Sequence, residues 1–165
     1  MFIFKVLGSA SIVISAALFY MEAQKYESKK LKQTEAFISL LRYIKKQIEC
    51  FSTPITHIIK ECDGDILSAC GLDIKREPEI TGANPMKELL ESCDFYIDVE
   101  AVESLKKFAN DFGRSYREEQ LRSCDYYISE LMIYRDKISA EIPKERKLRF
   151  AMCLCISASV ILLLI

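Results

Sequence analysis

The stretch Phe112–Gln120, FGRSYREEQ, decides the fold, because it joins the two longest helical patterns in the middle of the chain. Gly113 can adopt the positive φ that ends a helix, and Ser115 followed by Glu118 has the spacing of a capping box. The stretch therefore predicts a sharp corner between a helix that ends near residue 112 and one that begins after residue 115. Its residues suggest no catalytic chemistry.

The helix after this corner has the clearest apolar pattern in the chain. Its apolar residues recur at alternating steps of three and four, broken by Arg135. They are Leu121, Cys124, Ile128, Leu131, Ile138 and Ile142. An earlier stripe of the same spacing runs from Phe37 to Phe51. Two stripes of this length predict two long helices packed against each other.

Shorter helices are expected between the two long ones. Thr53 and Pro54 combine a hydroxyl cap with a proline in the first turn, which predicts a helix start. Asn84-Pro85 has the same pattern and predicts a short helix to residue 93. Asp98 is expected to cap a helix whose apolar face runs over residues 99–112, and Pro143 to bend or break the last helix.

The sequence does not assign a single role to several other side chains. Tyr126, Tyr127 and Tyr134 lie beside the seam and belong either to the edge of the core or to a contact surface. The 7 cysteines form no C-x-x-C pair, and His57 is the one histidine. We therefore expect reduced thiols and no metal, cofactor, catalytic or small-molecule site.

The two ends of the chain are its most apolar parts. Residues 2–21 carry Lys5 as their single charge, and residues 150–165 carry none. Since a helix needs about 20 apolar residues to cross a membrane, we expect transmembrane helices at residues 2–21 and 148–165 around a helical bundle at residues 22–147. A cleaved signal peptide is the alternative for the first stretch, and a buried core helix for the second.

Basic residues flank both expected spans on the side of the bundle. They are Lys25, Lys29, Lys30 and Lys32 after the first, and Lys144, Arg146, Lys147 and Arg149 before the second. The positive-inside rule then places the bundle in the cytoplasm, with its basic flanks at anionic membrane lipids. The whole chain carries 23 basic and 24 acidic residues, which argues against a nucleic-acid partner.

A G-x-S-x-x-x-x-Q pattern, formed by Gly113, Ser115 and Gln120, occurs together with Thr53-Pro54 and the two apolar ends. In this arrangement the chain resembles the stage III sporulation protein AB family over nearly its whole length. The resemblance implies an all-α membrane protein whose bundle is similar to the helical domains of type II secretion F proteins. It also makes Thr53, Pro54, Gly113, Ser115 and Gln120 the residues of structural or interaction interest.

The resemblance implies a function as well. It predicts a non-enzymatic scaffold of the channel between mother cell and forespore, located in the mother-cell membrane around the forespore and required for endospore formation. The expected partners are the stage III sporulation AA ATPase, other membrane proteins of the channel complex and membrane lipids. A membrane-anchored regulator or receptor for a soluble signalling protein is the alternative, and a membrane-tethered enzyme is a third hypothesis.

Overall fold

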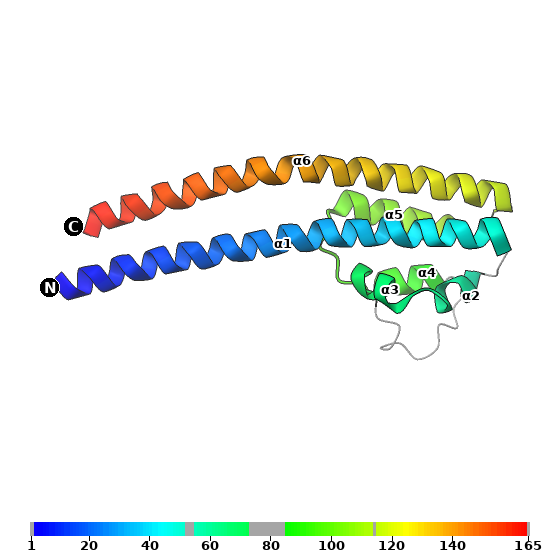
Figure 1. The fold of residues 1–165 in the computed structure, drawn as a ribbon, viewed down its shortest axis with the longest axis horizontal. Helices are drawn as coiled ribbons and strands as arrows, with labels where there is room; N and C mark the ends of the chain where they lie inside the picture. Colours follow the sequence, from blue (N-terminus) through cyan, green and yellow to red (C-terminus); the bar gives the residue numbers. More distant parts are fainter. Residues whose placement is uncertain (1, 52–54, 73–84, 114, 165) are drawn as a thin grey trace. The chain divides into compact units, whose positions relative to one another are not determined.

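The structure, a computed structural model, describes residues 2–51, 55–72, 85–113 and 115–164. These residues form the helices α1 (Phe2–Phe51), α2 (Ile55–Lys60), α3 (Gly64–Cys70), α4 (Pro85–Glu91), α5 (Val99–Asp111) and α6 (Arg117–Leu164), shown in Figure 1. Every regular element among them is α-helical, which agrees with the predicted helical class. The chain divides into a terminal unit, residues 1–29 and 138–165, and a central unit, residues 30–137.

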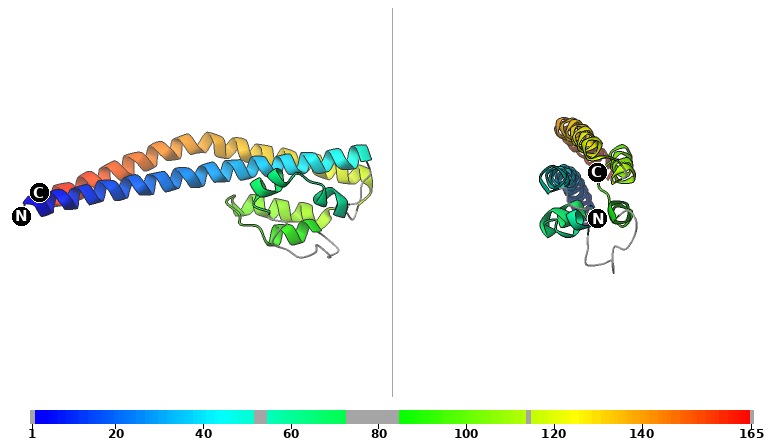
Figure 2. Two further views of the ribbon diagram at one scale, coloured as in Figure 1. Left: turned by 60° about the horizontal axis from the view of Figure 1, so that its bottom comes forward. Right: turned by 90° about the vertical axis from the view of Figure 1, so that its right-hand side faces the viewer.

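In the central unit, α1 and α6 run antiparallel. Lys45 Nζ on α1 lies 2.6 Å from Asp125 Oδ1 on α6, and the Arg42 guanidinium on α1 contacts Met132 Sδ on α6 at 3.4 Å. Residue numbers that fall along α1 therefore pair with residue numbers that rise along α6, as in antiparallel helices. The helix α5 packs beside α6, and α4 contacts both α5 and α2 (Figures 1 and 2).

The core of the central unit uses the predicted stripes. Phe37, Leu41 and Ile44 of α1 are 0% exposed. On α6 within this unit, the predicted stripe is buried or half-buried at Leu121, Cys124, Ile128 and Leu131. The prediction fails at Val99, which is 74% exposed. It stands at the first turn of α5, where Ala101, rather than Val99, falls on the inward face that continues to residues 105, 108 and 112.

The short helices follow the local signals in part. α4 starts at Pro85 as predicted and ends at Glu91. The helix α3 was not predicted: the Asp63 side chain accepts a hydrogen bond from the Asp65 N–H (3.0 Å) and begins it, because a short acidic side chain is a good N-cap. The predicted helix start at Thr53 and Pro54, and most of the connection over residues 71–85, lie outside the described residues.

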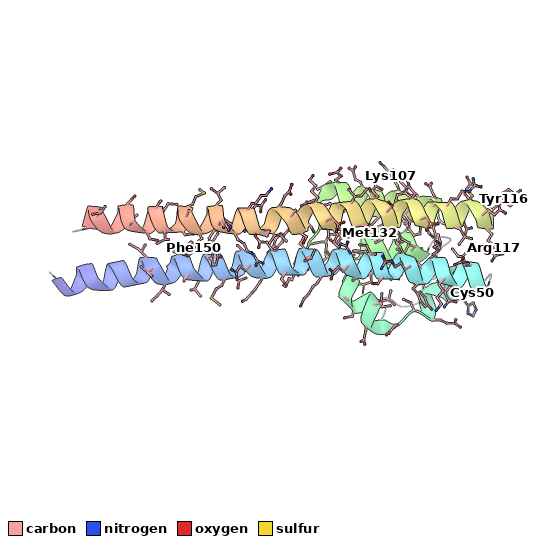
Figure 3. All side chains as sticks on the ribbon, turned by 45° about the horizontal axis from the view of Figure 1, so that its top comes forward. Cys50, Lys107, Tyr116, Arg117, Met132 and Phe150 are labelled. Carbon is pink, nitrogen blue, oxygen red and sulfur yellow. The ribbon has the colours of Figure 1, made fainter. Side chains whose placement is uncertain are left out.

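In the terminal unit, the two long helices also run antiparallel. The Tyr20 and Phe150 rings meet edge to face with centroids 5.9 Å apart, and Figure 3 shows Phe150 pointing from α6 towards α1. Of the two outcomes predicted at Pro143, a bend or a break, the break does not occur, because α6 continues through Pro143 as one helix. Pro143 and Ser139 are both exposed, so the Ser139 carbonyl that loses its helical partner can be hydrated.

The prediction of transmembrane helices at residues 2–21 and 148–165 is wrong. Among the residues that the structure describes, no helix combines enough length with enough apolar character to cross a membrane. The prediction was based on the absence of charge, but these stretches also contain hydroxyl groups, such as those of Ser11, Ser15 and Ser159, which make them less apolar. The same finding overturns the predicted two-span membrane localisation.

The core of the central unit can be tested by a pair of identical substitutions. Ile44→Ala removes a side chain that is 0% exposed and should lower the free energy of unfolding by about 2–5 kcal/mol. Ile133→Ala makes the same change at a helical position that is 69% exposed and should change it by less than about 0.5 kcal/mol. Urea denaturation followed by circular dichroism measures both. Equal effects would contradict the assigned burial.

Candidate functional site

The first half of the corner between α5 and α6, where α5 ends, forms as predicted. α5 ends at Asp111, and the Phe112 N–H continues the helical pattern by donating to the Phe108 carbonyl (2.9 Å). Gly113 then adopts φ 88°, the left-handed conformation that favours glycine. The predicted helix stop at Gly113 is therefore confirmed.

The second half of the corner uses different atoms from those expected. α6 begins at Arg117, one residue later than a helix capped by Ser115 would begin. Ser115 acts through its backbone carbonyl, which accepts a hydrogen bond from the Gln120 side-chain amide (2.7 Å). Gln120 thus ties the first turn of α6 back to the corner.

Arg117 fixes the corner against the end of α1. Its guanidinium donates to the carbonyl oxygens of Ile48 (3.1 Å) and Glu49. The last carbonyls of a helix have no partner within the helix, and a cation stabilises the negative end of the helix dipole. Figure 3 shows Arg117 and Cys50 at the same end of the paired helices. Sequence reasoning missed this contact, because nothing local to Arg117 indicates a distant helix end.

A pocket of about 360 Å³ opens at this corner. We call it the corner pocket; its lining residues are Asp111, Phe112, Ser115, Glu119, Gln120 and Ser123. The lining residue Phe112 belongs to a group of packed aromatic rings, since the Phe108 ring lies 5.0 Å from that of Phe112 and 5.5 Å from that of Tyr127. Burial, together with the Asp111 charge, raises the pKa of Tyr127. The structure thus brings Ser115 and Gln120 together in one pocket, directly beside Gly113.

A polar hub inside the central unit holds the irregular segment before α5. Gln33 is 3% exposed, and its Nε2 donates to the carbonyls of Cys70 (2.8 Å) and Asp94 (2.9 Å). Its Oε1 accepts a hydrogen bond from the Tyr96 N–H (2.7 Å). A Cβ at Gly71, which has φ 84°, would lie 3.2 Å from Gln33 Nε2. Gln33 was not predicted, although its place four residues before Phe37 puts it on the buried face of α1.

Lys30, Asp98 and Tyr134 join α1, α5 and α6 at the opposite end of α5 from the corner. Lys30 Nζ lies 2.8 and 2.7 Å from the two Asp98 carboxylate oxygens, and the Asp98 N–H donates to Tyr134 Oη (2.9 Å). Asp98 occupies the predicted N-cap position of α5, but its side chain makes no cap hydrogen bond, because the carboxylate pairs with Lys30 instead.

The pKa values of this trio shift in the directions that keep the ion pair charged. Burial would raise the pKa of Asp98, but hydrogen bonds from Lys30 and Tyr134 lower it below its usual value. Burial would lower the pKa of Lys30, but its hydrogen bond to Asp98 raises it overall. The pKa of Tyr134 is raised, chiefly by burial. Tyr134 therefore acts as a neutral hydrogen-bonding group at the core edge.

The terminal unit contains a buried carboxylate with two cationic partners. The Glu27 side chain is 7% exposed; one oxygen lies 2.6 Å from Arg146 Nε and the other contacts Arg149. Arg149 also pairs with Glu145 one turn earlier (2.9 Å). Arg149, expected at a membrane surface, is instead a partner of α1. The cluster contains two acids and two bases, so its charges balance.

Three thiols of the central unit, those of Cys70, Cys93 and Cys124, have raised pKa values that are unsuited to nucleophilic chemistry. Burial is the main cause that raises the pKa of Cys93 and of Cys124 to about 11. It raises the pKa of Cys70 further still. Because the thiolate is the reactive form, these side chains serve packing. Among the described residues, no group of three or more His, Cys, Asp or Glu side chains is arranged to hold a metal ion.

Comparison with known proteins identifies the family. The profile of the family described as stage III sporulation protein AB matches residues 5–165. The chain belongs to this family. Membership gives the chain a role in sporulation, as the resemblance to this family implied. Comparisons with curated proteins and with solved structures give no match.

The Lys30–Asp98 pair of this family member predicts a pH-dependent stability. The folded pKa of Asp98 lies below its unfolded value of about 3.9, so the carboxylate stabilises the fold above that pH and ceases to do so as pH falls through the folded pKa. Asp98→Asn should lower the free energy of unfolding by about 0.2–1 kcal/mol at neutral pH, because the side chain is 56% exposed. This difference should shrink below about pH 4.

Urea unfolding from neutral pH to about pH 3 measures this effect. Asp94→Asn is the matched control, since its side chain forms no ion pair with a described residue, and it should show no such trend. A difference between Asp98→Asn and the unmodified chain that stays constant over the whole range would contradict the pairing.

The Glu27 cluster predicts a larger effect in the terminal unit. Glu27→Gln leaves Arg146 and Arg149 without their buried anion and should lower the free energy of unfolding by about 1–3 kcal/mol. Glu22→Gln removes the partner of Lys25 in an exposed pair and should cost less than about 0.5 kcal/mol. Denaturation curves, with hydrogen exchange over residues 20–29, compare the two. Equal protection in both variants would refute the cluster.

Proposed function

We propose that this family member is a non-enzymatic helical scaffold in sporulation, which binds the stage III sporulation AA ATPase through a surface at the α5–α6 corner. Other proteins of the channel between mother cell and forespore are its further proposed partners. We call this surface the corner face; it comprises the corner pocket with Tyr116 and Tyr126. Family membership supports the role in sporulation, and the composition of the corner face supports its choice as the binding surface.

Exposed aromatic side chains are the observation that carries the proposal. Tyr116 is 89% exposed and Tyr126 is 63% exposed, although large aromatic rings are usually covered in folded chains. Tyrosine is enriched at protein interfaces, where it often contributes a large share of the binding free energy. On α6, Glu119, Ser123 and Tyr126 follow at helical spacing and so face the same side.

The corner face is held on a rigid support. Arg117 ties the start of α6 to the end of α1, and Gln120 ties the first turn to Ser115. Beneath it, Phe108 and Cys124 are 0% exposed. A surface that is already ordered loses little conformational entropy on binding, and a rigid support suits a scaffold that must transmit force from a motor.

The proposal is tested by binding of the full-length chain to the purified stage III sporulation AA ATPase. Tyr116→Ala and Tyr126→Ala should each weaken the complex by about tenfold or more, if these rings are interface anchors. Both side chains are exposed, so Tm should change by less than about 2 °C. Val99→Ala, at the other end of α5 and 74% exposed, is the control and should bind normally.

Surface plasmon resonance and thermal unfolding measure the two quantities on the same preparations. Failure of the unmodified chain to bind the ATPase would remove the proposed partner. Normal binding by both tyrosine variants would instead show that the corner face is not the surface that binds the ATPase.

A further inference from the structure

The lining of the corner pocket is unlike that of most small-molecule sites. Such sites are lined mainly by apolar and aromatic side chains. Of the described residues that line the corner pocket, Phe112 is apolar and the others are acids, hydroxyls or an amide. A volume of about 360 Å³ is enough for one large side chain of another protein. The lining thus favours a polar or charged group as occupant.

The charge of the lining residues determines whether the group that occupies the pocket should be positive or negative. Asp111 at the end of α5 and Glu119 in the first turn of α6 are exposed residues of the pocket lining. None of the described lining residues is cationic, so the formal charges among them are the two carboxylates of Asp111 and Glu119. A concave surface lined by one sign of charge attracts the opposite sign.

The interior of the pocket adds acceptors and an apolar surface. Gln120 Nε2 is committed to the Ser115 carbonyl, so its Oε1 is left as an acceptor, and the Ser123 hydroxyl is a second. A guanidinium carries five N–H donors in a planar fork, which several separate acceptors can engage at once. Its aliphatic stem can contact the small part of Phe112 that reaches the pocket, since this residue is 6% exposed. These features favour arginine over lysine.

We propose that the corner pocket receives an arginine side chain of a protein partner. Asp111 and Glu119 pair with its guanidinium, and Gln120 Oε1 accepts a further hydrogen bond from it. The inference rests on the proposed function in one respect, since the stage III sporulation AA ATPase is taken as the protein that supplies the arginine.

A small probe tests the pocket without the ATPase. The full-length chain is titrated with acetyl-arginine amide while NMR follows the Gln120 side-chain amide and the Ser123 backbone amide. Both resonances should shift, and acetyl-citrulline amide, which has the same shape without the charge, should leave them in place. The double variant Asp111→Asn/Glu119→Gln should bind the probe about tenfold or more weakly. Glu118→Gln, which neutralises a carboxylate outside the lining, should stay within about twofold.

The same variants, tested with the ATPase, separate the two possible failures. Charge-dependent binding of the probe without binding of the ATPase would support the arginine pocket and contradict the ATPase as the partner. Equal binding of the ATPase by the unmodified chain and the double variant, or equal action of the arginine and citrulline amides, would overturn the pocket proposal. Ser123→Arg fills the pocket from within the chain and should block the ATPase; normal binding by this variant would also overturn the proposal.

Discussion

Burial of one stripe of α1 is the constraint on which the central unit depends. Phe37, Leu41 and Ile44 are excluded from solvent, and α5 and α6 contribute their own apolar faces to the same core. Burying each such side chain stabilises the fold by about 1.5–3 kcal/mol. The corner at Gly113 follows from this requirement, because α5 and α6 can both reach the core only if the chain reverses direction sharply between them.

Polar contacts then fix the sliding and rotation of the helices, which hydrophobic burial alone leaves undetermined. Apolar faces can slide or rotate at small cost, whereas a buried amide must find its own partners or lose stability. Gln33 satisfies this demand by binding three backbone groups of segments distant in sequence. Lys30 with Asp98, and Arg117 with the end of α1, secure α5 and α6 in a similar way. In the terminal unit, Glu27 has the corresponding role for its two helices.

The sequence predicted those parts of the structure that depend on local physics. Spacing alone placed Phe37, Leu41 and Ile44 of α1 in the core, together with the stripe of α6 from Cys124 to Leu131. The need for a positive φ located the end of α5 at Gly113. Contacts between distant segments were not predicted, because no local pattern indicates that Arg117 meets Ile48 or that Gln33 meets Asp94. The membrane spans failed for another reason: absence of charge was treated as if it were sufficient apolar character.

Gln120 shows how a structural and a binding role can belong to one side chain. An amide has separate donor and acceptor ends. Its donor end closes the corner through Ser115, which accounts for a glutamine at this position without any partner. Gln120 also belongs to the lining of the corner pocket, together with Glu119 and Ser123. In the proposed complex, the donor end of Gln120 holds the corner and its acceptor end receives the arginine, so one side chain serves both roles.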